Sequence, residues 1–309
     1  ALAKLVPAMK LLTVVILTKN EEIHIERALN SVKGIADRTI VVDSGSDDRT
    51  VELAQAMGAI VLSNPWTNHA TQFNWALDQL PADTQWVMRL DADEYVTPEL
   101  EREIALTMPD LPSEIHGISI GRRMNFLGER VRFGGLFPIR IIRLFRHGRG
   151  RCENRWMDEH ILVEGATAEF AGEIIDDNRN SLTWWTEKHN AYASREVVEM
   201  LNLEHGFLAM DSNGDLNSGQ QATIKRWLKN KLYARLPGQL RALFYFLYRF
   251  VLRLGFLDSK EGRAFHVLQG FWYRFLVDAK LQEVRKHMRE TQKDAKTAIR
   301  DVLGIDLQR

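Results

Sequence analysis

The sequence is poor in cysteine, has ordinary glycine and proline contents, and shows no excess of charge of either sign. Cys152 is the single cysteine among 309 residues, which excludes an internal disulfide framework and a cysteine-rich zinc module. The 41 basic residues balance the 41 acidic residues, so the whole chain lacks the charge of a general polyanion binder. The 20 glycines and 8 prolines exclude a collagen-like or low-complexity protein. The remaining class is a globular protein of a compartment that keeps thiols reduced.

Long uninterrupted apolar runs are also absent. No stretch reaches the ~20 apolar residues of a spanning helix, and the closest approach, residues 240–257, contains three arginines. The short segment before Met9 lacks the charged, apolar and cleavage regions of a signal peptide. We therefore expect neither a signal peptide nor a spanning helix, and an apolar content of 45% is enough for a sizeable core.

Apolar strands alternate with amphipathic helices in the first third of the chain. The β-branched run from Leu11 to Leu17 predicts a strand that is buried on both faces, as in a parallel sheet. Further strands are predicted at 39–42, 59–62 and 85–90, and helices at 23–32, 50–57 and 70–80. This alternation with short links predicts an open α/β sheet with right-handed crossovers.

The pattern changes twice along the rest of the chain. Short strands at 117–120, 139–145 and 161–163 lie between loops rich in glycine and arginine, and helices are predicted at 223–236, 240–257 and 271–297. We therefore predict an α/β domain over 10–180, with parts 10–112 and 113–180, followed by a helical region over 181–309.

Polar clusters follow three of the predicted strands, at 18–22, 43–48 and 91–94. In open α/β sheets the ligand crevice lies beyond the carboxyl ends of the strands, so these clusters are expected to converge. Asp91 and Asp93 form an Asp-X-Asp motif that suits a cation such as Mg²⁺ or Mn²⁺ shared with phosphate oxygens. A lone Asp-X-Asp is more often a solvated turn, but the preceding strand and the neighbouring clusters favour a metal site. The sequence has no Gly-X-Gly-X-X-Gly and no P-loop motif, which excludes the usual dinucleotide and ATPase phosphate cradles.

Residues 14–22 (Val-Val-Ile-Leu-Thr-Lys-Asn-Glu-Glu), 40–50 and 90–94 resemble the N-terminal signature of family 2 glycosyltransferases with the GT-A fold. The resemblance extends over roughly 11–172, and its later part is similar to the bacterial branch that includes lipopolysaccharide core β-glucosyltransferases. It implies a GT-A nucleotide-sugar-binding fold, which is a Rossmann-like open sheet, with a helical C-terminal extension. It also implies an inverting transfer of a hexose from a nucleotide sugar, usually a UDP-sugar, with Mn²⁺ or Mg²⁺ as cofactor.

The same resemblance implies roles for individual residues. The nucleotide-binding part is 10–112, where the nucleoside is held by Thr18, Asn20, Glu21 and Asp43. Asp93 is expected to be the direct metal ligand, while Asp91 contacts the ribose or a metal-bound water. The acceptor part is 113–180. There, residue chemistry rather than the resemblance makes Arg143 a candidate for binding diphosphate or an anionic acceptor group, because guanidinium groups pair with such oxygens. His160 is a candidate ligand of metal or diphosphate, with an ordinary surface or packed histidine as the alternative.

Direct displacement needs a carboxylate that takes the proton of the acceptor hydroxyl. Asp158 and Glu159 form an acidic pair before the apolar residues 161–163. Aligning the second residue of this pair with the family gives Glu159 as the base and leaves Asp158 as the alternative. The alternative is that Asp158 and Glu159 belong to an ordinary acidic loop and have no catalytic role.

The C-terminal region contains a basic span without a single acid, from Lys225 to Leu257. Its eight basic residues are Lys225, Arg226, Lys229, Lys231, Arg235, Arg241, Arg249 and Arg253. Basic helices rich in apolar side chains lie in the membrane interface and attract anionic lipid. The alternative is a helical bundle packed on the catalytic domain or on a second subunit, and no nucleic-acid-binding module is present.

We therefore expect a peripheral enzyme at the cytoplasmic face of the bacterial inner membrane. Its expected partners are a nucleotide-sugar donor, the membrane surface and a lipid-linked or lipopolysaccharide glycan acceptor, with no nucleic acid and with a homo-oligomer left open. Two alternatives remain: a sugar transferase acting on a soluble or protein acceptor, and a non-catalytic nucleotide-sugar-binding assembly protein.

Overall fold

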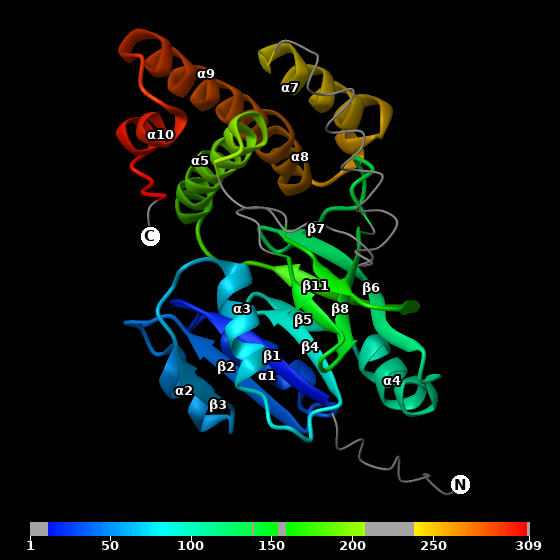
Figure 1. Ribbon diagram of the computed structural model, residues 1–309. Helices are drawn as coiled ribbons and strands as arrows, with labels where there is room; N and C mark the ends of the chain where they lie inside the picture. Colours follow the sequence, from blue (N-terminus) through cyan, green and yellow to red (C-terminus); the bar gives the residue numbers. More distant parts are fainter. Residues whose placement is uncertain (1–11, 138, 154–158, 208–237, 308–309) are drawn as a thin grey trace, which may run out of the picture.

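The computed structural model describes residues 12–137, 139–153, 159–207 and 238–307. A curled sheet flanked by helices is followed by a group of helices that lies against one end of the sheet (Figure 1). The predicted helix at 223–236, the basic residues within it and Asp158 lie outside the described residues.

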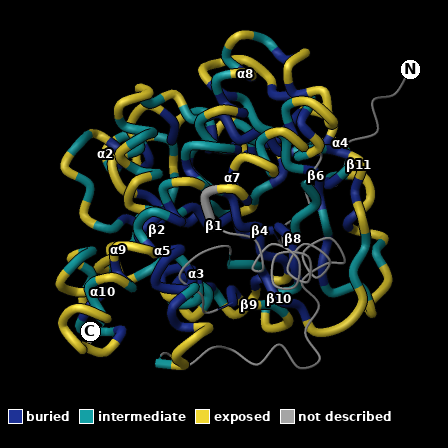
Figure 2. The backbone as a smooth tube through the Cα atoms, turned by 90° about the horizontal axis from the view of Figure 1, so that it is seen from above, coloured by how far each residue is buried: buried dark blue, intermediate teal, exposed yellow. Residues whose placement is uncertain are grey.

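Four parallel strands form the first half of the sheet, and all four were predicted with ends within two residues of those observed. They are β1 (Leu12–Thr18), β2 (Arg38–Asp43), β3 (Ile60–Ser63) and β4 (Trp86–Asp91). β1 lies between β2 and β4, and β3 pairs with the far side of β2. Figure 2 shows that buried positions concentrate in these central strands, as expected for uninterrupted apolar runs.

Helices cover both faces of this half. They are α1 (Ile25–Val32), α2 (Thr50–Ala56), α3 (His69–Asp78) and α4 (Pro98–Thr107). α1 buries Ile25, Ala28, Leu29 and Val32, the stripe that its sequence spacing predicted, in an apolar core shared with α2 and α4. α3 packs on the opposite face through Ala70, Phe73 and Ala76.

The second half of the sheet is mixed in direction. Its strands are β5 (Glu94–Val96), β6 (Ile115–Phe126), β7 (Glu129–Arg130), β8 (Ile139–Arg146) and β11 (Ala166–Asp177). The spatial order is β3-β2-β1-β4-β8-β6-β11-β5, and β7 pairs with β6. β8 is antiparallel to both β4 and β6, whereas β11 is parallel to β6. A separate antiparallel pair is formed by β9 (Gly150–Cys152) and β10 (Ile161–Val163).

The helical region begins after β11. It contains α5 (Leu182–His205), α7 (Gly238–Leu247), the π-helix η3 (Tyr248–Leu252), the 3₁₀-helix η4 (Gly255–Leu257), α8 (Lys260–Val267), the π-helix η5 (Leu268–Trp272), α9 (Tyr273–Thr291) and α10 (Ala295–Leu303). α5, α9 and α10 share an apolar core, and Phe265 of α8 packs on Phe126 of the sheet. Among the described residues, no helix has the length and apolar content to cross a bilayer.

The predicted helices at 240–257 and 271–297 were wrong in their continuity. The backbone turns left-handed at Leu254 (φ 59°) and at Gln292 (φ 55°), which interrupts each helix. Arg241 and Arg249, which the sequence assigned to a membrane-facing side, are buried instead with 8% and 1% exposure. The prediction of an α/β open sheet with a helical C-terminal region is confirmed.

Candidate active site

The three polar clusters that follow β1, β2 and β4 meet at one edge of the sheet, as predicted. Thr18 of β1 pairs in register with Asp43 of β2, and Leu17 pairs with Asp91 of β4. The Thr18 hydroxyl donates a hydrogen bond to Asp43 Oδ1 at 3.0 Å. Parallel strands bring their carboxyl ends to a common edge, and this edge therefore carries the candidate site.

Asp43 organises the loop that follows β2. Its Oδ2 accepts hydrogen bonds from the backbone N–H groups of Gly45 and Ser46, both at 2.8 Å, and its Oδ1 accepts from the Ser46 hydroxyl at 2.5 Å. The residue is only 4% exposed. A carboxylate with this many donors fixes a turn, which gives Asp43 a clear role in shaping the loop.

The loop after β1 is tied to the loop after β2. Asn20 adopts a left-handed conformation (φ 58°), its N–H donates to the Ser46 hydroxyl at 2.8 Å, and its Oδ1 accepts from Asp47 N–H at 3.0 Å. The N–H of Glu21 donates to the Thr50 hydroxyl at 2.7 Å. The two loops therefore form one hydrogen-bonded rim around the edge of the sheet.

Glu21 has a buried partner in His24. His24 Nδ1 lies 2.6 Å from Glu21 Oε2, and His24 Nε2 accepts the backbone N–H of Arg179 at 2.8 Å. Because Nε2 is an acceptor, the proton of the neutral imidazole is on Nδ1 and is donated to Glu21. Burial raises the pKa of Glu21 despite this hydrogen bond.

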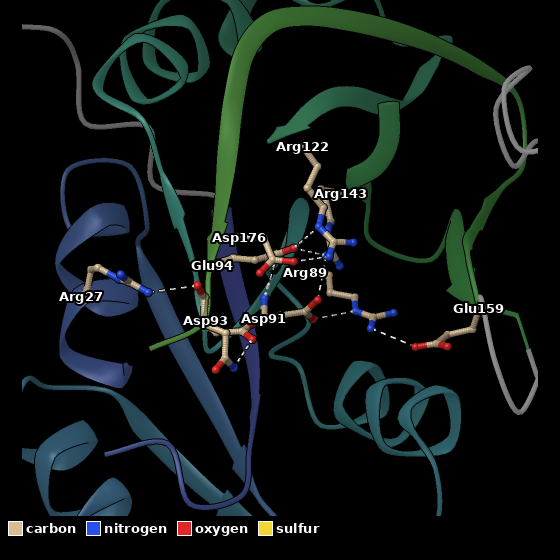
Figure 3. Close-up of polar contacts among 10 residues, drawn as sticks. Arg27, Arg89, Asp91, Asp93, Glu94, Arg122, Arg143, Glu159 and Asp176 are labelled. Carbon is tan, nitrogen blue, oxygen red and sulfur yellow. Dashed lines mark hydrogen bonds and ion pairs between the residues drawn. The ribbon is translucent and has the colours of Figure 1, made fainter. Parts of the chain in front are cut away.

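Asp91 lies between two guanidinium groups (Figure 3). Arg143 Nη2 is 2.8 Å from Asp91 Oδ2, and Arg89 Nε is 3.4 Å from Asp91 Oδ1. Burial alone opposes ionisation of Asp91, but Arg143 and Arg89 outweigh it and hold the pKa of Asp91 well below its usual value. Asp91 is therefore ionised, and both of its oxygens are engaged by protein cations.

Arg143 also contacts the buried Glu94, which the sequence analysis did not single out. Arg143 Nη2 is 2.6 Å from Glu94 Oε1, and Arg122 Nε lies 3.2 Å from the same oxygen. Burial raises the pKa of Glu94 to about 7 even beside these arginines. Arg122 also forms an ion pair with Asp176. Arg143, predicted as a diphosphate ligand, is thus committed to two carboxylates in this structure.

Asp93 has a different environment. Asn178 Nδ2 donates to Asp93 Oδ2 at 2.9 Å, and Arg27 Nη2 donates to the Asp93 backbone oxygen at 3.1 Å. Within the described ranges, no donor contacts the second carboxylate oxygen of Asp93. The charges of Glu21 and Lys188 are close enough to interact with the Asp93 carboxylate.

The donor set around the Asp-X-Asp motif fits a divalent cation that is completed by substrate. The described residues hold no cluster of three or more His, Cys, Asp or Glu that forms a metal site, so Asp91, Asp93 and His160 do not make a closed site in this part of the chain. Mg²⁺ is often bound by one or two carboxylates together with substrate phosphates. The free oxygen of Asp93 meets that requirement, whereas Asp91 is already engaged by arginines.

Glu159 lies on the other side of Arg89 from Asp91 (Figure 3). Arg89 Nη2 contacts Glu159 Oε1 at 3.1 Å, and the exposed fraction of the Glu159 side chain is 13%. His160 is half-buried, and its backbone oxygen accepts the N–H of Glu153 at 2.8 Å. The structure therefore brings Glu159 to the Asp-X-Asp motif through a shared guanidinium, while Asp158 is outside the described residues.

Sequence reasoning did not single out three charged residues of this site, namely Arg89, Glu94 and Asp176. A usable signal existed for Arg89, which interrupts the apolar strand β4 and needs a buried partner. His69 was also missed. Its Nδ1 is buried without a hydrogen-bond partner among the described residues, burial lowers its pKa, and it interacts with the charges of Glu159 and Arg89.

A small cavity adjoins Asn178. It has a volume of about 40 Å³ and is lined in part by Asp176, Asn178, Asn180 and Trp185. This volume has room for only a few waters at most.

Comparison with known proteins supports a family assignment. Residues 13–149 match the family described as Glycosyl transferase family 2. The chain is 45% identical over 95 residues to an uncharacterised glycosyltransferase of Rickettsia bellii, covering 31% of this chain and 32% of that protein. It is 46% identical over 96 residues to a Rickettsia typhi protein with the same description, covering 31% and 32%. These matches span about a third of the length of the curated relatives.

Two further similarities cover different shares of the chain. A TPR repeat-containing protein of Synechococcus elongatus is 32% identical over 286 residues, covering 85% of this chain and 67% of that protein. The structure of glucosyl-3-phosphoglycerate synthase from Mycobacterium tuberculosis, with Mn²⁺, UDP and glucosyl-3-phosphoglycerate, is 24% identical over 38% of this chain and 46% of that chain, with a TM-score of 0.30. The similarity to glycosyl transferase family 2 therefore covers residues 13–149, which is less than half of the chain.

Proposed function

We propose that the chain transfers a hexose from a nucleotide sugar of the UDP-linked class to an acceptor hydroxyl, with inversion at the sugar carbon. The observation that carries this proposal is the grouping of Asp43, Asp91 and Asp93 at the carboxyl edge of β1, β2 and β4, with Glu159 joined to Asp91 through Arg89. The family 2 domain and the relatives described as glycosyltransferases support the same activity.

The proposed seat of the nucleoside is the rim made by the two hydrogen-bonded loops. Thr18, Asn20 and Glu21 contribute one side, and the turn held by Asp43 contributes the other. These contacts preorganise the loops, so that donor binding orders little additional backbone.

Asp93 would hold Mn²⁺ or Mg²⁺ through its free carboxylate oxygen. When bound, the cation supplies positive charge that neutralises the departing diphosphate. Asn178 orients the Asp93 carboxylate, and Arg27 fixes the backbone beneath it. His160 remains a prediction as a further ligand, and the two arginines on Asp91 leave that residue a positioning role.

Glu159 is proposed to take the proton of the attacking hydroxyl at one of its carboxylate oxygens. Its ion pair with Arg89 directs the carboxylate toward the Asp-X-Asp side of the site. Removing the proton as the hydroxyl attacks makes the acceptor oxygen a better nucleophile in a single displacement. Asp158 remains the alternative base.

The proposed acceptor is a lipid-linked or lipopolysaccharide glycan at the cytoplasmic face of the bacterial inner membrane. Its support is the sequence resemblance and the apolar and basic composition of the span from Lys225 to Leu257. A soluble or protein acceptor, and a non-catalytic nucleotide-sugar-binding protein, are the competing functions. A donor screen that follows both UDP release and sugar transfer separates them, because a binding protein releases no UDP.

Calorimetry with UDP and Mn²⁺ tests the donor and metal parts of this proposal. Asp93→Ala should weaken Mn²⁺-dependent UDP binding by more than about tenfold, because it removes the proposed ligand. The matched control is Asp110→Ala, which removes an exposed carboxylate distant in sequence from the site and should leave binding unchanged. Absence of UDP binding by the unmodified protein, or binding that EDTA does not weaken, contradicts the proposal.

A further inference from the structure

The segment from α7 through η4 presents an apolar surface to the outside of the molecule. Ten of its large apolar or aromatic residues are between 39% and 73% exposed. They define the outer apolar face: Leu240, Leu243, Phe244, Leu247, Tyr248, Val251, Leu252, Leu254, Phe256 and Leu257. Contiguous exposed apolar patches of this kind are uncommon on monomeric soluble proteins and mark interaction sites.

Two of the three charged residues of the same segment, Arg241 and Arg249, face inward, whereas Arg253 is exposed. Arg241 Nε is 3.0 Å from Asp278 Oδ2 of α9, and both residues are buried. Arg249 is 1% exposed and lies 3.1 Å from His266 Nδ1 of α8. A helix against water normally buries its apolar side and exposes its charged side. Here the pattern is inverted, which suits an outer surface that is not in contact with bulk water.

Basic residues predominate among the exposed charges of the segments that adjoin the outer apolar face. Within 127–137 and 238–270, the exposed charged residues are Arg130, Arg132, Arg253, Lys260 and Arg263 against Glu129. Backbone contacts hold the two segments together: Gly134 N–H donates to Arg253 O at 2.9 Å, and Arg132 N–H donates to Asp258 Oδ1 at 2.9 Å. The apolar face therefore has a predominantly basic rim.

We propose that the outer apolar face docks on an anionic lipid surface, with its apolar side chains in the interface and the basic rim at the headgroups. Apolar insertion together with basic residues at the edge is the combination that binds such surfaces. A second copy of the chain is a poorer occupant, because a two-fold interface would place the same face on itself and bring two basic rims together. This proposal rests on the proposed function, because the lipid surface on which the protein docks would also carry the lipid-linked acceptor.

Cosedimentation of the full chain with lipid vesicles tests this docking. The unmodified protein should bind phosphatidylcholine vesicles that contain phosphatidylglycerol more tightly than vesicles of phosphatidylcholine alone. Phe244→Ser with Leu252→Ser should weaken binding by at least about tenfold, because both residues belong to the outer apolar face. The matched control is Leu106→Ser with Leu203→Ser, two residues of similar exposure on α4 and α5, which should bind like the unmodified protein.

A charge variant separates the two contributions. Arg130→Gln with Lys260→Gln should reduce binding only to the anionic vesicles, and added salt should have the same direction of effect. Circular dichroism melting of each variant confirms that the fold is retained. Sedimentation velocity of the unmodified protein and of the Phe244→Ser, Leu252→Ser variant measures oligomeric state.

The outcomes are distinct. Vesicle binding that depends on Phe244 and Leu252 but not on Leu106 and Leu203 supports the proposal. Failure of the unmodified protein to bind anionic vesicles overturns it, as does a dimer that the Phe244→Ser, Leu252→Ser change dissociates. UDP release from a soluble donor is followed in the same preparations. If the unmodified protein releases UDP but does not bind vesicles, the docking surface is refuted while the proposed function stands.

Discussion

Replacing Arg143 by methionine removes a guanidinium that contacts two carboxylates, Asp91 of the Asp-X-Asp motif and the buried Glu94. The Arg143 side chain is 6% exposed, and its contact at 2.6 Å is with Glu94, whose side chain is 1% exposed. Breaking a buried ion pair by removing one partner costs about 3–5 kcal/mol, because the other charge stays buried without compensation. The contact with Asp91 adds less, since a third of that side chain is exposed. We therefore expect Arg143→Met to lower the free energy of unfolding by about 3–5 kcal/mol near pH 8.

The size of this loss should depend on pH. Burial raises the pKa of folded Glu94 to about 7, above the ordinary value of 4.5 for an exposed glutamate, so the folded state binds its proton more tightly than the unfolded state. The stability that protonated Glu94 contributes is complete below its unfolded pKa and is lost as pH rises through about 7. Near pH 5.5 Glu94 is largely neutral and needs no cation, so Arg143→Met should cost about 1–2 kcal/mol less than near pH 8.

Urea unfolding of Arg143→Met, Glu94→Gln and the double variant measures the coupling directly. A coupling free energy of about 2 kcal/mol is expected between Arg143 and Glu94 near pH 8. Arg149→Met is the matched control. Arg149 lies just after β8, the strand that carries Arg143, but its side chain is 55% exposed and its ion pair with Glu164 is long at 3.8 Å. That control should differ little from the unmodified protein. A loss for Arg143→Met no larger than for Arg149→Met, or one that grows as pH falls, would refute this reasoning.

Two further predictions concern the packing of the sheet. A Cβ on Gly172 of β11 would lie 2.5 Å from the Leu100 Cα and 2.8 Å from the Leu100 backbone nitrogen. Gly172→Ala must therefore push β11 away from α4, and urea unfolding should show a free energy of unfolding that is lower by about 1–3 kcal/mol. Stability equal to that of the unmodified protein would mean that α4 does not pack on β11. Cys152 is fully buried, and burial raises the pKa of its thiol to about 12. After iodoacetamide treatment near pH 8, mass spectrometry should therefore find Cys152 unmodified in the folded protein and alkylated in urea. Rapid alkylation without urea would contradict the packing of β9.

The strands of the parallel half were predictable because local sequence decides them. The apolar run that forms β1 has one low-energy placement, at the centre of a sheet with both faces covered. β11 was not predicted, because Ala, Gly and Glu interrupt its apolar pattern and a register shift lies between Glu169 and Glu173. Its place in the sheet depends on pairing with β6 and β5, which are distant in sequence.

The site was predictable at the strand ends and not beyond them. Asp43, Asp91 and Asp93 follow apolar strands, so their convergence follows from parallel topology. The ion pairs of Arg143 with Glu94 and of Arg89 with Glu159 join residues 49 and 70 positions apart. These contacts depend on β8 lying antiparallel beside β4 and on the position of β10, which no local pattern specifies.

Sequence reasoning also did not show which side of the segment from α7 to η4 faces the interior. The sequence analysis expected the arginines of the basic span to meet anionic lipid, which requires that they be exposed, and exposed charge is the usual arrangement. Arg241 is buried because it pairs with Asp278 of α9, and Arg249 is buried beside His266 of α8. Such partners become visible only when the packing of the helices is known.

The most direct test of the central claim is sugar transfer by Glu159→Gln. UDP release from a UDP-sugar, measured with Mn²⁺ and an acceptor found by the donor and acceptor screen, should fall by ~10²–10⁴-fold while calorimetry shows UDP binding retained. Glu164→Gln is the control, because Glu164 lies just after the short strand β10, which Glu159 precedes, and its side chain is 63% exposed. Normal turnover by Glu159→Gln would contradict the assignment of Glu159 as base, and a loss with Asp158→Asn alone would move that role to the neighbouring residue.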